Sequence, residues 1–101
     1  YAKRYILIDY KDTVLKWLQS IDDPDLAFIV AEPHLFNPEY PLKIDETTIN
    51  YLELKDETDL AVLLILRVEN GKVIPNLNGP LLINSSNMKG IQVLLDSFEK
   101  K

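Results

Sequence analysis

The sequence predicts a mostly β protein, a small antiparallel β-barrel-like domain with one short helix. Short apolar runs separated by turn residues recur along the chain, as they do in β-sandwiches and β-barrels. A single segment combines a capping residue with the apolar side of a helix. The 101 residues, of which 47% are hydrophobic, suffice for one core and are too few for two ordinary domains.

The first part of the chain holds two expected strands with an ambiguous run between them. Residues 5–8 and 26–31 are short and rich in β-branched and aromatic side chains, which favours a pleated sheet. Residues 14–19 fit either a strand or a helical turn, and their periodicity does not decide between the two. Residues 21–25 predict a turn, because proline suits its second position and aspartate side chains bond nearby amides.

A proline-rich segment follows between residues 33 and 41. Its three prolines recur too closely for a helix or a central strand, so the segment is expected to be an ordered loop or a sheet edge. It also carries bulky apolar side chains, which are not typical of a flexible linker. Leu42 and Ile44 are expected to form a short strand beyond it.

The one expected helix runs from Asp45 to about Leu54. Asp45 can cap its first turn, and Glu46 adds the negative charge that the start of a helix favours. Ile49 and Leu52 supply its apolar side. The helix therefore interrupts an otherwise β-rich chain.

The second half of the chain returns to strands. Residues 60–66 are apolar at successive positions, as expected of a strand that is covered on both faces. Asn70-Gly71 between apolar runs predicts a hairpin, with residues 73–77 as the partner strand and Pro75 at an edge or bulge. Two more strands are expected at residues 81–84 and 91–95, which brings the total to about seven. Residues 96–101 are expected to fray.

Charge and composition exclude several classes of protein. Sixteen acidic and eleven basic residues give a net charge of −5, which argues against direct nucleic-acid binding and permits a basic protein as partner. Without cysteine the chain has neither a disulfide nor a thiolate metal site. No apolar run reaches the length of a membrane span, and charged residues interrupt the N-terminal apolar run, so a cytoplasmic domain without membrane contact is expected.

The residue patterns give little support for catalysis. His34 is the only histidine, and a surface loop residue is its best interpretation. Asp22, Asp23 and Asp25 carry the oxygen ligands that Ca²⁺ takes, but their spacing fits a turn better than a calcium loop. No serine lies in a nucleophile-elbow pattern, and the three glycines form no phosphate loop. No catalytic, cofactor-binding or metal-binding residue is therefore predicted.

Four residues near the proline-rich segment are the candidate partner-binding site: Glu32, Phe36, Glu39 and Tyr40. The two aromatic rings either form a recognition patch or fold back over the end of the barrel as core. The acidic residues fall on two loops, with Glu32 and Glu39 in one and three aspartates in the other. If the loops share one end of the barrel they form a negative face; otherwise they are ordinary solvated residues.

Five separated blocks of the sequence resemble the flagellar assembly factor FliW family. The first runs from Trp17 to Val30 and reads WLQSIDDPDLAFIV, where the family has W-L-Q-S, an apolar residue and then D-D-P-x-L-A-F. The others follow in the family's order and are P-x-L-F-x-P-x-Y from Pro33 to Tyr40 and residues 59–63, 76–84 and 90–93. The resemblance covers residues 1–95.

The chain also departs from the pattern of that family. Members usually begin upstream with another strand and a Gly-Phe element, and they commonly end in a Tyr-Pro-containing tail, where this chain has residues 97–101. Asn78-Gly79 stands where apolar and small residues are more common. Residues 1–101 are therefore interpreted as a single FliW-like domain that lacks the usual N-terminal strand.

The resemblance implies a non-enzymatic cytoplasmic protein with a β-barrel-like fold, no cofactor and two protein partners. FliW proteins bind flagellin before its export, and they bind CsrA, a basic RNA-binding regulator that represses flagellin synthesis. When flagellin leaves the cell, freed FliW captures CsrA and relieves that repression, which is a partner switch. The oligomeric state stays open.

A second class of function stays open beside the first. The alternative is a small acidic β-barrel enzyme or carbohydrate-binding module that uses clustered carboxylates and Trp17. A deep cleft with converging acids favours the enzyme, and a closed barrel favours the interaction protein.

Overall fold

The computed structural model describes residues 4–40 and 42–95. Seven strands are present there: β1 (Tyr5–Asp9), β2 (Lys16–Ser20), β3 (Ala27–Ala31), β4 (Leu60–Glu69), β5 (Lys72–Pro75), β6 (Leu81–Asn84) and β7 (Lys89–Gln92). One α-helix and two 3-10 helices accompany them: α1 (Glu46–Leu52), η1 (Pro33–Leu35) and η2 (Glu57–Asp59). The predicted mostly β fold with one short helix is confirmed. No helix within these residues is long and apolar enough to cross a membrane.

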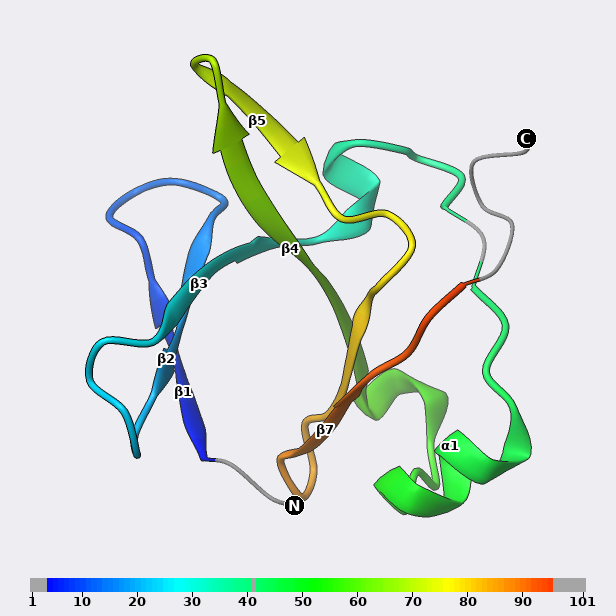
Figure 1. Cartoon of the computed structure of the whole chain (residues 1–101). Helices are drawn as coiled ribbons and strands as arrows, with labels where there is room; N and C mark the ends of the chain where they lie inside the picture. Colours follow the sequence, from blue (N-terminus) through cyan, green and yellow to red (C-terminus); the bar gives the residue numbers. More distant parts are fainter. Residues whose placement is uncertain (1–3, 41, 96–101) are drawn as a thin grey trace.

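All seven strands belong to one antiparallel sheet that curls into a half-barrel (Figure 1). The strand order is β1-β2-β3-β4-β6-β7, and β5 pairs with the far end of β4. Among the described residues β1, β5 and β7 each pair with one strand. β1 and β7 end the main strand order and are therefore the two edges of the curl. The predicted barrel-like shape is therefore confirmed in an open form.

Buried hydrophobic side chains come from both faces of the sheet and from α1. The side chain of Asn84 in β6 donates a hydrogen bond of 2.8 Å to the carbonyl of Leu52, the last residue of α1. Since α1 lies outside the ring of strands, this contact identifies the outer face of the sheet (Figure 1). Successive side chains along a strand point to opposite faces, so the residues next to Asn84 in β6 point into the curl. The buried hydrophobic residues include Val30, Ala31, Leu52, Leu63, Leu64, Leu66 and Leu82.

The central strand and its hairpin agree with the sequence prediction. None of residues 60–66 is exposed, as expected of a strand covered on both faces. Asn70 and Gly71 have φ angles of 53° and 77°, the left-handed pair that a type I′ turn requires. Pro75 ends β5, and the chain leaves the sheet there before it returns as β6.

The ambiguous run at residues 14–19 forms a strand. β2 begins at Lys16 and pairs with β1 along its whole length, from Tyr5 opposite Ser20 to Asp9 opposite Lys16. Val14 lies outside the strand and is 66% exposed. The pairing with β1 and β3 decides a conformation that local periodicity does not.

Two expectations about the middle of the chain are wrong. Leu42 and Ile44 form no strand; both are half-buried, so their apolar side chains serve packing rather than strand pairing. The proline-rich segment was expected to exclude any helix, yet Pro33 begins η1. Proline is tolerated at the first position of a helical turn, because its missing amide has no partner there in any case.

The ends of two elements also differ from expectation. The helix ends at Leu52 rather than Leu54, because Glu53 takes the left-handed φ of 55°. The last strand covers Lys89–Gln92 instead of residues 91–95. The amides of Val93 and Leu95 nevertheless donate to the carbonyls of Pro80 and Asn78, so backbone bonding continues past the strand. The expected fraying of residues 96–101 lies outside the described residues.

The cap of α1 gives a pH-dependent prediction. The carboxylate of Asp45 accepts a hydrogen bond from the Thr48 amide at 2.8 Å, and the hydrogen bonds from Thr48 lower the pKa of Asp45 below its ordinary 3.8. A lowered folded pKa means that the contribution to stability is present above pH 3.8 and is lost as the pH falls through the folded pKa. Asp45→Ala is expected to lower the melting temperature at neutral pH and to make less difference in strong acid.

Thermal unfolding of Asp45→Ala and Asp45→Asn between neutral and acid pH checks this prediction. Asparagine keeps the oxygen that accepts the Thr48 amide but does not titrate, so its curve should lack the acid-dependent loss. An equal acid-dependent loss in the native chain and in Asp45→Asn would assign the titration to other groups.

Candidate functional site

The proline-rich segment follows the end of β3 and is held by its own hydrogen bonds. The amides of Phe36 and Asn37 both donate to the Pro33 carbonyl at 3.0 Å. The side chain of Asn37 accepts from the Glu39 amide at 3.0 Å, and its carbonyl accepts from the Tyr40 amide. These contacts make the segment an ordered platform, as the sequence predicts.

Tyr40 fixes the far end of this segment to the sheet. The residue is 9% exposed, and its hydroxyl donates to the Leu77 carbonyl at 2.5 Å. Burial raises the pKa of Tyr40, so the hydroxyl stays protonated and keeps donating at physiological pH. Of the two roles that the sequence left open, the geometry gives the Tyr40 ring a packing role.

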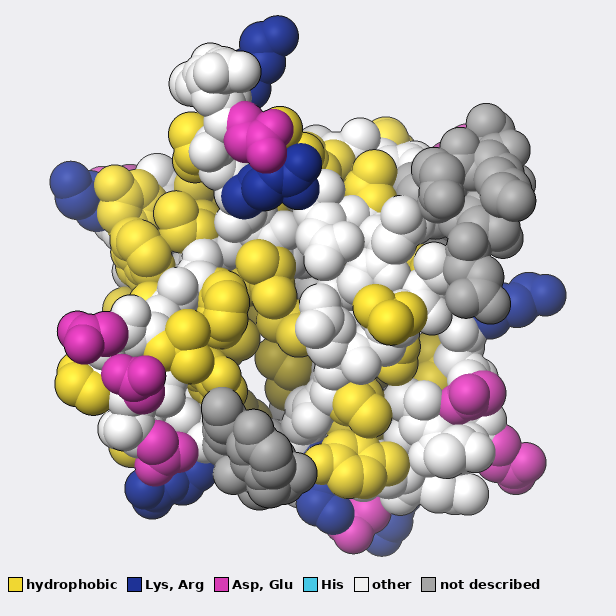
Figure 2. All heavy atoms as spheres, in the orientation of Figure 1, with side chains coloured by type: hydrophobic (Ala, Val, Ile, Leu, Met, Phe, Trp, Pro, Cys, Tyr) yellow, Lys and Arg dark blue, Asp and Glu magenta, His cyan; other side chains and the backbone are white. Residues whose placement is uncertain are grey.

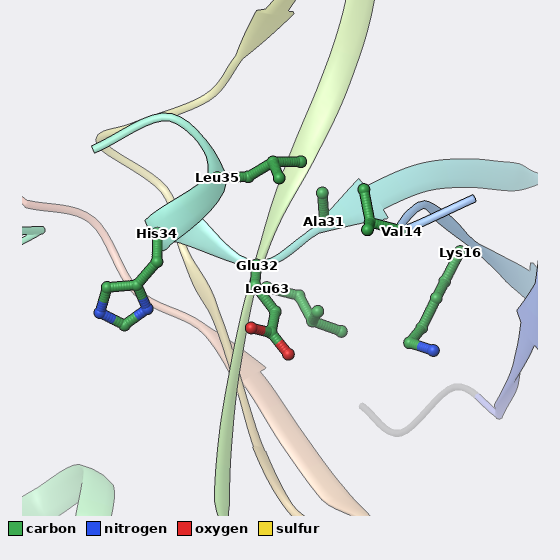
Figure 3. Close-up of a pocket in the computed structure, with 7 residues that line it drawn as sticks. All are labelled: Val14, Lys16, Ala31, Glu32, His34, Leu35 and Leu63. Carbon is green, nitrogen blue, oxygen red and sulfur yellow. The ribbon is translucent and has the colours of Figure 1, made fainter. Parts of the chain in front are cut away.

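The other three candidate residues present more of their side chains to solvent. Glu32 and Glu39 are exposed, and Phe36 is half-buried. Glu32 lines a hollow of about 430 Å³ together with Lys16 of β2, His34 of η1 and an apolar floor that includes Leu63 (Figure 3). The hollow therefore combines both signs of charge over apolar side chains.

The two acidic loops do not form one negative face. The aspartate loop at residues 21–26 precedes β3, and Glu32 and Glu39 follow it, so the loops lie at opposite ends of that strand. Within the aspartate loop, the Asp25 amide donates a hydrogen bond to Asp23 Oδ1 at 3.0 Å. Arg4 Nη2 forms an ion pair with Asp22 Oδ1 at 2.7 Å. The condition for a shared negative face is not met, because the two loops flank opposite ends of β3. The other interpretation, ordinary solvated acidic residues, therefore holds.

Trp17, which the enzyme or sugar-binding alternative uses, packs against another aromatic ring. Trp17 is half-buried and packs edge-on against Tyr10, with the ring centroids 5.9 Å apart. His34 is exposed at η1. Within residues 4–40 and 42–95, no three histidine, aspartate or glutamate side chains are placed to hold a metal ion. The described part of the chain thus offers no specific support for the enzyme alternative.

Sequence reasoning missed an apolar surface on the inside of the curl. Figure 2 shows hydrophobic side chains gathered around a hollow in the middle of this view. In the edge strand β1, Ile6, Leu7 and Ile8 are 43–46% exposed. Because successive side chains point to opposite faces, apolar side chains are accessible on both faces of this edge strand. The sequence does not show this because a run of apolar residues does not reveal the strand order, and therefore not that its strand lies at a sheet edge.

A curled antiparallel sheet, a capped helix on its outer face and an apolar inner surface together define a small β protein of half-barrel architecture. The chain belongs to the FliW family, because the family model described as FliW protein matches residues 1–101.

Three relatives that carry the name flagellar assembly factor FliW support this membership. The protein of Alkaliphilus metalliredigens is 42% identical over 98 residues, covering 93% of this chain and 60% of its own. The protein of Thermoanaerobacter pseudethanolicus is 41% identical, covering 88% and 61%. The protein of Caldanaerobacter subterraneus subsp. tengcongensis is 39% identical, covering 86% and 59%. The chain thus spans about three-fifths of the length of these relatives.

A solved structure gives the same result for the fold. The crystal structure of the flagellar assembly factor FliW matches with a TM-score of 0.83 and 34% identity. The match covers 90% of this chain and 65% of that one. The half-barrel described here is therefore the corresponding part of the FliW fold.

Proposed function

We propose that the protein is a flagellar assembly factor that works without catalysis in the cytoplasm. In this proposal it binds flagellin before export and binds the translational regulator CsrA, which relieves the repression of flagellin synthesis. The observation that carries the proposal is membership of the FliW family over all 101 residues. The names of the relatives refer to flagellar assembly. Binding of flagellin and of CsrA is the more specific part of the proposal.

The charge of the chain supports a basic partner such as CsrA. The net charge is −5, and complementary charge chiefly raises the rate of association and discriminates against wrong partners. Glu32 and Glu39 flank the ordered segment and are exposed, so their carboxylates are accessible to such a partner. Lys16 lines the same hollow as Glu32 and pairs with Asp9 at 2.6 Å, so Glu32 faces a cation that already has a partner.

The aromatic part of the same segment supports an apolar partner such as a flagellin helix. An amphipathic helix binds by laying its apolar face against an apolar surface. Phe36 is half-buried on a segment whose backbone is hydrogen-bonded at Pro33 and whose end is anchored by Tyr40. A residue on an ordered segment loses less conformational entropy on binding than one on a mobile loop.

Charge reversal at the two glutamates tests the CsrA interface. The double variant Glu32→Lys with Glu39→Lys is expected to weaken CsrA binding by roughly tenfold at low salt, which corresponds to about 1.4 kcal/mol. The loss should shrink as salt is added, because exposed charges are screened. Isothermal titration calorimetry at two salt concentrations measures both effects.

A matched variant controls for total charge in this experiment. Asp25→Lys with Glu57→Lys changes the net charge equally at two exposed positions, of which Asp25 lies before β3. Unchanged CsrA affinity in the first variant, or an equal loss in the control, would remove Glu32 and Glu39 from the interface.

Truncation of Phe36 tests the flagellin surface. Phe36→Ala is expected to weaken flagellin binding by roughly tenfold or more, because an aromatic anchor at an interface contributes about 2 kcal/mol. The melting temperature, measured beside the affinity, should change little for a ring that is half-buried. A large fall in melting temperature would instead assign Phe36 to the core.

A further inference from the structure

Two Asn-Gly pairs occur in the chain, and the structure places them in opposite environments. Asn70-Gly71 forms the tip of the β4–β5 hairpin, and both residues are exposed. Asn78-Gly79 lies in the turn before β6, where Gly79 is buried. An asparagine followed by glycine is the dipeptide most open to attack on its side chain, because glycine has no Cβ to shield its amide nitrogen.

The hairpin tip leaves the reacting groups accessible. A Cβ added at Gly71 would meet no atom within 4 Å, so the space beside the Gly71 Cα is open. Neither the Gly71 amide nor the Asn70 side chain takes part in a hydrogen bond in the described part of the chain. Both φ angles are positive, and no packing at the tip opposes the rotation that brings the Gly71 nitrogen to Asn70 Cγ.

The second pair is held in place on several sides. A Cβ at Gly79 would come within 2.8 Å of the side-chain nitrogens of Asn76 and Gln92. The Gln92 side chain donates to the Gly79 carbonyl at 2.9 Å, and the Leu95 amide donates to the Asn78 carbonyl at 2.7 Å. Reaction at this pair first requires the turn to open, and local opening has a cost in free energy.

We infer that Asn70 is a site of spontaneous deamidation, and that Asn78 is protected by its packing. The Gly71 amide loses its proton to hydroxide, and the resulting nitrogen anion attacks Asn70 Cγ to form a new N–Cγ bond. The Cγ–Nδ2 bond then breaks, and the leaving amide takes a proton from water and departs as ammonia. Water then opens the resulting succinimide at either carbonyl, which gives aspartate or isoaspartate. Water is the only co-reactant, and no oxidation or reduction takes place.

The modification changes the hairpin in two ways. Isoaspartate adds a methylene to the backbone, which breaks the two-residue geometry that the type I′ turn requires. Either product adds a negative charge next to Glu69, whose carboxylate pairs with Arg67 Nε at 2.8 Å. The β4–β5 pairing beyond Leu66 is therefore the part of the sheet that the modification disturbs.

Peptide mapping by mass spectrometry tests the inference. The folded chain is incubated at mildly alkaline pH, digested at intervals and analysed for the mass change of amide to acid, with isoaspartate methyltransferase labelling to identify isoaspartate. Asn70 is expected to react at least about tenfold faster than Asn78, since a tenfold ratio needs only a small opening free energy at the protected site.

Two controls make the result decisive. In strong denaturant both pairs should react at similar rates, because the packing around Asn78 is gone. In the folded variant Asn70→Gln, which would need a larger ring to react, modification at the tip should fall to background. Equal rates for Asn70 and Asn78 in the folded chain, or an unmodified Asn70 under conditions where the denatured chain reacts, would overturn the inference.

Discussion

Replacing Leu64 by alanine is expected to lower the free energy of unfolding by about 2–5 kcal/mol. Leu64 lies in β4, the strand to which β3, β5 and β6 all pair, and its side chain is 0% exposed. The shorter side chain leaves a cavity whose walls relax only in part, so the lost contacts are not replaced. A domain of this size has a total stability of roughly 5–15 kcal/mol, so this loss alone can bring it close to unfolding.

Chemical denaturation of Leu64→Ala beside Leu94→Ala measures this effect. Leu94 is 81% exposed, so the same chemical change there should alter the free energy of unfolding by less than about 0.5 kcal/mol. A small effect at Leu64, or equal effects at both positions, would contradict the assignment of β4 to the centre of the core.

Replacing Asn84 by aspartate is expected to cost about 3–5 kcal/mol at neutral pH, although the two side chains have nearly the same shape. Asn84 is 2% exposed, and its Nδ2 donates to the carbonyls of Leu52 at 2.8 Å and Glu53 at 3.3 Å. A carboxylate there would lose both donated bonds and would bring a buried negative charge against two carbonyl oxygens. The contact between α1 and β6 would be the first part of the fold to open.

Asn87 offers a matched control for this substitution. Its Nδ2 also donates to the Leu52 carbonyl, at 3.0 Å, but the residue is exposed. Asn87→Asp should therefore cost no more than about 1 kcal/mol, because water can solvate the new charge. Denaturant titrations at neutral pH compare the two variants. Similar losses would mean that burial does not decide the effect and that Asn84 does not hold α1 to the sheet.

Much of the fold follows from local sequence. Asn70-Gly71 fixes the hairpin because its two positive φ angles suit few other residue pairs, and Asp45 fixes the start of α1 because its carboxylate bonds the Thr48 amide. The apolar run at residues 60–66 reveals the central strand, since a strand covered on both faces needs apolar side chains at every position.

Long-range packing accounts for what the sequence does not reveal. Leu42 and Ile44 have the pattern of a short strand, but no neighbouring strand pairs with them. The partner of the Tyr40 hydroxyl is the Leu77 carbonyl, 37 positions away, and no local pattern identifies it. The opposite placement of the two acidic loops follows from the direction of β3 in the sheet. Each of these features depends on pairing between distant segments.

The candidate site, like the fold, is predictable from the sequence only in part. The sequence predicts an ordered segment that carries aromatic and acidic side chains, and the structure shows that order. It does not predict that Tyr40 is an anchor, that Glu32 shares a hollow with Lys16, or that β1 exposes apolar side chains at an edge. These features depend on which strands become neighbours in the curl.

Sedimentation velocity of the purified chain mixed with monomeric flagellin, and separately with CsrA, tests the proposed function most directly. The chain is expected to co-sediment with each partner, while lysozyme, a basic protein of unrelated function, should leave its sedimentation unchanged. Binding to CsrA should weaken with added salt, because the chain carries a net charge of −5. Unchanged sedimentation with both flagellin and CsrA at micromolar concentrations would contradict the proposal that this domain is a flagellar adaptor.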